Sequence, residues 1–133
     1  MTGEMKPRRS RRILLADDDE VTQEVVRRVV EKSGHRIIRV VAGATAFDAA
    51  CVTQPDLIVL DIQFPDADGR DVLAKLKADP RTAYIPVVVW SGRKGHDSDA
   101  RIALDLGAED YIEKHDPQLL LGKLERVLLR LHE

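Results

Sequence analysis

Five strand-like segments, most of them almost entirely apolar, constrain the fold of this chain most strongly. Near-continuous apolar strands are typical of a parallel sheet that is buried on both faces. Each segment is short and is separated from the next by a stretch with helical or turn character. The segments are residues 13–16, 36–41, 57–60, 87–90 and 111–112.

The stretches between these segments predict helices. Val21, Val25 and Val29 repeat at helical spacing before Ser33 and Gly34, where a glycine is available for a left-handed cap. Strands that alternate with helices favour a parallel sheet with helices on both faces and right-handed crossovers. We therefore expect an α/β fold with a five-stranded, doubly wound parallel sheet. The further helices are expected at 45–53, 70–78, 98–106 and 117–131.

Length and composition indicate one globular domain without a membrane span. The chain has 133 residues, 44% of them apolar and 33% charged, with a net charge of −2. No apolar stretch approaches the ~20 residues that cross a bilayer. The single cysteine, Cys51, allows no internal disulfide, which fits a cytoplasmic protein. We expect residues 1–10 to be a basic flexible tail and residues 11–133 to form the domain.

The polar residues that end the apolar segments predict a functional site. The carboxyl ends of parallel strands share one edge of the sheet, where ligands bind in open α/β folds. The residues there are Asp17, Asp18, Asp61, Ser91 and Lys114. Clustered carboxylates repel one another, and a divalent cation removes that repulsion. Oxygen ligands that leave room for water suit Mg²⁺, so we expect a magnesium site here.

Capping of the next helix is the alternative explanation for these acids. Asp19 fits it well, as an N-cap or first-turn residue that complements the helix dipole. A cap needs only one residue, so Asp17 and Asp18 are better explained as a site. A carboxylate such as Asp61 beside Mg²⁺ can attack phosphorus and form an acyl phosphate. Lys114, the Ser91 hydroxyl and the backbone amide of Gly92 could then neutralise and orient the phosphoryl oxygens.

Four motifs follow one another along the chain: Ile13–Asp19, Pro55–Gly69, Ile85–Gly92 and Gly107–Lys114. Their order and spacing resemble those of the receiver domain of two-component response regulators, over about residues 11–131. The resemblance implies the strand order 2-1-3-4-5, Mg²⁺ as cofactor and phosphorylation of Asp61 by a histidine kinase or phosphotransfer protein within a phosphorelay. It implies a signalling role with self-catalysed phosphorylation and dephosphorylation rather than ordinary enzyme turnover.

The resemblance also implies a role for each site residue. Asp17, Asp18, Asp61 and the backbone carbonyl of Gln63 would hold the metal. Ser91 and Tyr111 would form a switch pair that changes a protein-binding face at the fourth helix, fifth strand and fifth helix. That face would contact a downstream protein or a second copy of the chain, and Leu119 and Leu129 are either part of it or isolated surface leucines.

The positions that tune phosphoryl lifetime in the family are Gln63 and Arg93 here. Both side chains are long and polar, and we expect them to shield an acyl phosphate from water. His115 departs from the family pattern, because it follows Lys114 where proline is usual. A cis bond before a non-proline residue costs about 2.5–4 kcal/mol. We therefore expect this loop to differ or to keep a trans bond.

Three other functions are alternatives to a receiver domain. An aspartate-nucleophile phosphatase of the haloacid dehalogenase type needs a second aspartate at position 63, where this chain has Gln63. A phosphorylation-independent binding module on the same fold is disfavoured by the intact set of acids, Ser91 and Lys114. Nucleic-acid binding through the arginine-rich tail is disfavoured because the tail has no aromatic residues and the rest of the chain no basic excess.

Overall fold

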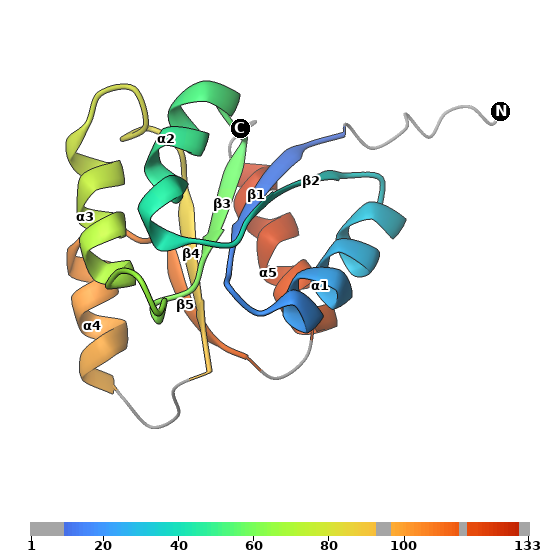
Figure 1. The fold of residues 1–133 in the computed structure, drawn as a ribbon. Helices are drawn as coiled ribbons and strands as arrows, with labels where there is room; N and C mark the ends of the chain where they lie inside the picture. The colour runs from blue at the N-terminus through green and yellow to red at the C-terminus, as the bar shows by residue number, and fades with distance from the viewer. Residues whose placement is uncertain (1–9, 93–96, 115–116, 131–133) are drawn as a thin grey trace, which may run out of the picture.

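The computed structural model describes residues 10–92, 97–114 and 117–130. Ten elements alternate strictly along these ranges (Figure 1). The strands are β1 (Arg12–Ala16), β2 (Arg36–Val40), β3 (Leu57–Leu60), β4 (Val87–Ser91) and β5 (Asp110–Glu113). The helices are α1 (Glu20–Lys32), α2 (Gly43–Thr53), α3 (Gly69–Ala78), α4 (Asp97–Asp105) and α5 (Pro117–Arg130).

All five strands are parallel and lie in the order β2-β1-β3-β4-β5. This confirms the doubly wound α/β fold and the strand order that the sequence resemblance implies. The register aligns Ala16 with both Val40 and Leu60, and Leu60 with Val89. The residues that follow β1 and β3 therefore emerge side by side at the same edge of the sheet.

Strand alternation divides the core into two layers, one on each face of the sheet. On one face, Leu14, Ile58 and Val89 contact α2, α3 and α4. On the other face, Leu15, Val59 and Trp90 contact α1 and α5. Figure 1 shows α1 and α5 together on one side of the sheet and α2 to α4 on the other. Trp90 is 4% exposed and therefore belongs to the core.

The helix boundaries that fall within the described residues differ from the predicted ones by at most two residues, and local contacts explain the largest difference. The predicted end of the last helix, at residue 131, lies outside the described residues. α2 begins at Gly43 rather than at Thr45. Its N-cap residue, Ala42, offers no side-chain acceptor, but Asp66 from the β3–α3 loop accepts hydrogen bonds from the amides of Gly43 and Ala44. A cap supplied by a distant residue cannot be read from the local sequence.

Two predicted helix ends are confirmed in detail. Asp19 is the N-cap of α1 and accepts a hydrogen bond from the Val21 amide. Gly34 follows α1 with φ +92°, a conformation that favours glycine. Along the described ranges, every helix falls short of the length and apolar character that crossing a bilayer requires. Except for Ser10, the predicted tail at 1–10 lies outside the described residues.

Candidate functional site

The site lies at the edge of the sheet where the strands end, which we call the carboxyl edge. Backbone hydrogen bonds continue the sheet by one residue there. The Asp17 amide donates to the Val40 carbonyl at 3.0 Å, and the Asp61 amide donates to the Ala16 carbonyl at 2.9 Å. These bonds fix where Asp17 and Asp61 leave the sheet, as predicted from the two apolar segments.

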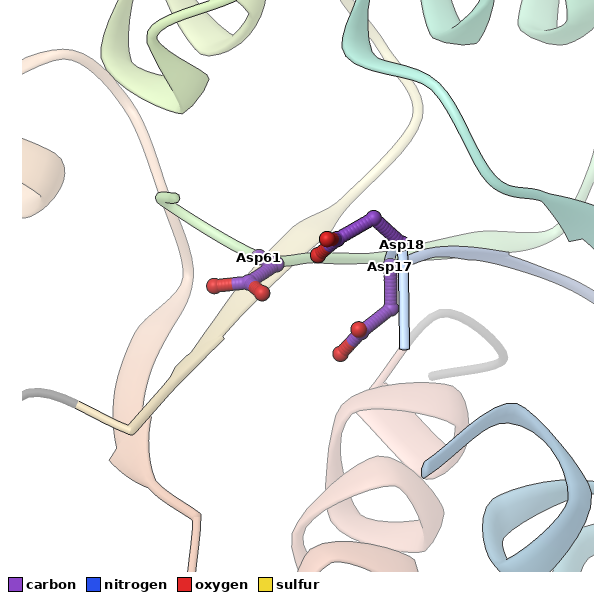
Figure 2. A group of neighbouring side chains, drawn as sticks. All are labelled: Asp17, Asp18 and Asp61. Carbon is purple, nitrogen blue, oxygen red and sulfur yellow. The ribbon is translucent and has the colours of Figure 1, made fainter. Parts of the chain in front are cut away.

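Three carboxylates gather at this edge. Each of Asp17, Asp18 and Asp61 offers an oxygen within 4.8 Å of the others. Figure 2 shows Asp17 and Asp18 leaving the end of β1 in different directions, with Asp61 beside them at the end of β3. Asp17 and Asp61 are buried, at 1% and 6% exposed, whereas Asp18 is exposed. The cluster is thus embedded in the sheet on one side and open to solvent on the other.

Lys114, which follows β5, brings a positive charge to the two buried carboxylates. Its Nζ donates to Asp17 Oδ2 at 2.5 Å and to Asp61 Oδ2 at 3.0 Å. The Lys114 amide donates to the Ser91 carbonyl at 2.8 Å, which anchors the residue beside β4. Its Nζ also lies 5.5 Å from the centre of the Trp90 ring, within cation–π distance.

Among the described residues, three carboxylates of the cluster face one lysine, and burial and neighbouring charge act in opposite directions on the pKa values of Asp17 and Lys114. Burial raises the pKa of the Asp17 carboxyl above its ordinary value of 3.8, against the opposing effect of the hydrogen bond from Lys114. Burial alone would lower the pKa of Lys114, but the hydrogen bond to Asp17 and the charges of both aspartates outweigh it and raise that pKa. The site therefore favours additional positive charge.

The loop after Asp61 is held in a tight turn. The Gln63 amide donates to Asp61 Oδ1 at 3.1 Å, and Gln63 forms an isolated antiparallel bridge with Asp68. At Gly69 an added Cβ would lie 2.4 Å from the Asp61 carbonyl oxygen and 2.5 Å from Ile62 Cα. Only glycine fits such an approach, so the start of α3 packs directly against the backbone of the site.

The other predicted site residues lie around this cluster. Ser91 is fully buried at the end of β4, and Gly92 follows it on the surface, where an added Cβ would meet only Lys114 Cδ at 4.0 Å. The Tyr111 side chain packs against the α2–α4 side of the core, and its hydroxyl is buried without a hydrogen-bond partner among the described residues. Arg93 and the Lys114–His115 bond lie outside the described residues.

Two residues that the sequence patterns do not predict also contribute to this edge. Asp66 caps α2 from the β3–α3 loop. Gln23 of α1 is completely buried, on the same helical face as Val26 and Val30. A polar residue at a core position of a helix is a signal that could have identified Gln23. Asp66 has no such signal, because an aspartate does not stand out in a loop that is rich in turn-forming residues.

The donor set fits a hard divalent cation. All candidate ligands are oxygens, and one of the three carboxylates is exposed, so waters can complete the coordination as Mg²⁺ prefers. Among the described residues, this cluster contains no thiolate or imidazole, the ligands that softer metals select.

Comparison with known proteins identifies the family. Residues 13–125 match the response regulator receiver domain. The transcriptional regulatory protein GltR of Pseudomonas aeruginosa is 31% identical over 121 residues, which cover 90% of this chain and 50% of GltR. The polar-differentiation response regulator DivK of Brucella ovis is 34% identical over 102 residues, which cover 77% of this chain and 82% of DivK.

A solved structure of another response regulator is also similar to this chain. The Mn²⁺-bound form of response regulator Rcp1 superposes with a TM-score of 0.70 at 32% identity, covering 79% of this chain and 81% of that one. The chain therefore belongs to the response regulator receiver domain family, a family of signalling modules in two-component systems. It spans about half the length of GltR, a transcriptional regulator.

Proposed function

We propose that this chain accepts a phosphoryl group on Asp61 from a histidine kinase or phosphotransfer protein and relays the signal through a protein-binding face. The observation that carries the proposal is the meeting of Asp17, Asp18, Asp61 and Lys114 at one edge, although they lie up to 97 residues apart in the sequence. Family membership supports the same function.

The transfer is a substitution at phosphorus. An Asp61 carboxylate oxygen forms the new P–O bond while the bond from phosphorus to the donor's imidazole nitrogen, or to a small donor's leaving oxygen, breaks and its electron pair leaves with the donor. Lys114 donates to one phosphoryl oxygen, and the Ser91 hydroxyl and the Gly92 amide donate to others.

Asp17, Asp18, Asp61 and the Gln63 carbonyl would hold Mg²⁺, whose charge offsets that of the phosphoryl oxygens. The Mn²⁺ in the Rcp1 structure supports a divalent ion in a relative of this chain. The same residues would promote hydrolysis of the acyl phosphate, so the chain catalyses its own phosphorylation and dephosphorylation. Gln63 and Arg93 would set the lifetime of the phosphoryl group by limiting access of water.

The output face in this proposal is formed by α4, β5 and α5. A groove there is lined by Leu104 from α4, Asp110 from β5 and Leu129 from α5, together with charged residues of both signs. Leu104 and Leu129 are 49% and 67% exposed, which makes them available to a partner. Ser91 and Tyr111 would couple phosphorylation to this face, since Tyr111 belongs to β5. The partner is a downstream protein or a second copy of the chain.

The experiment is intact mass spectrometry after incubation with Mg²⁺ and acetyl phosphate. We expect the wild-type protein to gain one phosphoryl group, and we expect neither Asp61→Asn nor the wild type with a chelator to gain it. The control is Asp56→Asn, which changes an aspartate at the opposite edge and should be phosphorylated like the wild type. An unmodified wild-type protein would favour a phosphorylation-independent binding module instead.

We further infer a cytoplasmic location, where histidine kinases transfer their phosphoryl groups.

A further inference from the structure

Gln23 is a buried polar side chain that the proposed reaction does not use. It lies on the face of α1 that packs against the sheet, and its side chain is 0% exposed. A buried amide is costly unless its hydrogen-bonding groups find partners. Its contacts therefore indicate what holds it there.

The Gln23 amide group binds three backbone carbonyls at the ends of two strands. Its Nε2 donates to the carbonyls of Leu15 at 3.0 Å, Asp17 at 3.0 Å and Val40 at 2.9 Å. An amide nitrogen carries two hydrogens, so one of them is shared between acceptors. Turning the amide over would place its oxygen against three carbonyl oxygens, which fixes its orientation. The Gln23 Oε1 atom has no partner among the described residues.

These contacts fix the backbone that carries two of the proposed metal ligands. The carbonyl of Asp17 belongs to the peptide plane that joins Asp17 to Asp18. The amide of Asp17 is held separately by the Val40 carbonyl, which also accepts from Gln23. With both peptide planes of Asp17 anchored, the directions in which the side chains of Asp17 and Asp18 leave the chain are set.

We propose that Gln23 is a positioning residue for the metal site, acting through the peptide bond between Asp17 and Asp18. This inference rests on the proposed function, because it assumes that these two aspartates hold the cation. Groups that orient metal ligands without touching the metal typically contribute about 10–100-fold to affinity.

The test is calorimetric titration of Mg²⁺ into two variants of similar instability. Gln23→Met keeps the approximate volume and removes the amide, and we expect its dissociation constant for Mg²⁺ to rise about tenfold. Val30→Ala is the control, since Val30 is 1% exposed on the same face of α1 but two turns away from the site. We expect it to lose stability on urea unfolding and to bind Mg²⁺ like the wild type. Gln23→Leu repeats the test with a different side-chain shape.

Three results would overturn the inference. Unchanged Mg²⁺ affinity in folded Gln23→Met would show that the amide does not position the ligands. An equal loss of affinity in Val30→Ala would show that loss of helix stability alone explains the effect. Failure of both Gln23 variants to fold would assign the residue to folding instead. A wild-type protein that binds no Mg²⁺ would overturn the proposed function itself, which is a separate outcome.

Discussion

The polar groups at the two edges of the sheet differ in how they are paired. At the edge where the strands begin, which we call the amino edge, each key polar group has a partner. His35 is 4% exposed, its Nδ1 accepts from the Arg11 amide at 3.1 Å, and its Nε2 lies 3.2 Å from Glu125 Oε1. Asp56 accepts a hydrogen bond from the Arg12 amide at 2.9 Å.

At the carboxyl edge, three neighbouring carboxylates face one lysine among the residues that the structure describes. Lys114 contacts two of three neighbouring carboxylates, and burial keeps water away from Asp17 and Asp61. Neighbouring carboxylates are not needed to stabilise this fold, because the polar groups at the amino edge of the same sheet are paired with one another. This difference supports the proposal that the carboxyl edge holds a cation and the phosphoryl group.

The largest expected effect comes from removing Lys114, whose Nζ contacts Asp17 and Asp61. Lys114→Met leaves the buried carboxylates of Asp17 and Asp61 without its positive charge, which should lower the free energy of unfolding by about 3 kcal/mol in chelator. Added Mg²⁺ should restore much of this loss, because it replaces the missing charge. Urea unfolding with and without Mg²⁺ measures both effects.

Lys123→Met is the control for this prediction. Lys123 Nζ lies 3.8 Å from Asp110 Oδ2, and the two side chains are 39% and 40% exposed. Removing such an exposed ion pair should change the free energy of unfolding very little. If Lys114→Met also changed the free energy of unfolding very little, the carboxylates at the carboxyl edge would cost no more stability than ordinary surface charges. The contrast between the two edges would then disappear.

At the amino edge, disrupting a matched pair should affect stability and leave the site intact. His35→Leu removes the acceptor of the Arg11 amide and the partner of Glu125, which should cost about 2 kcal/mol of unfolding free energy. Mg²⁺ affinity and the rate of phosphorylation by acetyl phosphate should stay at wild-type values. A large loss of Mg²⁺ affinity would contradict the separation of the two edges. Glu125→Gln, which keeps an acceptor at that position, should cost less.

Removing one negative charge from the carboxyl edge should stabilise the protein. Asp17→Asn should raise the free energy of unfolding at pH 7 in chelator, by on the order of 1 kcal/mol, the usual size of a single-residue effect. The pKa of Asp17 is raised in the folded protein, chiefly by burial. Ionised Asp17 therefore destabilises the fold, and this cost is lost as pH falls through the folded-state pKa toward the unfolded value of 3.8.

Urea unfolding at several pH values tests this sign. The advantage of Asp17→Asn should shrink as pH is lowered from 7 toward about 4, and Mg²⁺ should reverse it by stabilising the wild type more. Asp56→Asn at the amino edge should show no such gain. A loss of stability in metal-free Asp17→Asn would mean that the bond from Lys114 outweighs the cost of burial.

The smallest effect compares two tyrosine hydroxyls. The hydroxyl of Tyr111 is buried without a partner among the described residues, so Tyr111→Phe should stabilise the protein by about 0.5 kcal/mol. Tyr84 lies near the amino edge, and its hydroxyl contacts Gln54 Oε1. Tyr84→Phe should therefore give no gain. Thermal unfolding of the two variants measures the difference, and an equal change in both would remove the contrast.

The sequence predicted the parts of the site that local patterns encode. Apolar segments predict strands, and the residue that ends each strand is placed at a sheet edge by the parallel topology. This rule places Asp17, Asp61 and Ser91 at the site, and the end of the fifth segment places Lys114 there. The sequence also predicts that Asp19 caps α1, and the bond from the Val21 amide confirms this.

The contacts of Asp66 and Gln23 could not be predicted, because each joins segments that are distant in the sequence. Asp66 binds amides 23 and 22 residues away, and Gln23 reaches the Val40 carbonyl 17 residues away. Local patterns carry the period of a helix or strand and the identity of its ends. They do not show how a loop is oriented toward a helix that is distant in the sequence.

The sequence by itself determined the fold class, the order of the elements and the residues at the carboxyl edge, because apolar periodicity and strand ends are local properties. Only the tertiary structure decided which carboxylates Lys114 contacts, that Asp17 is buried while Asp18 is exposed, and that Gln23 holds the peptide between them. These features depend on how β1, β3, β5 and α1 pack together, and packing joins side chains that no local pattern connects.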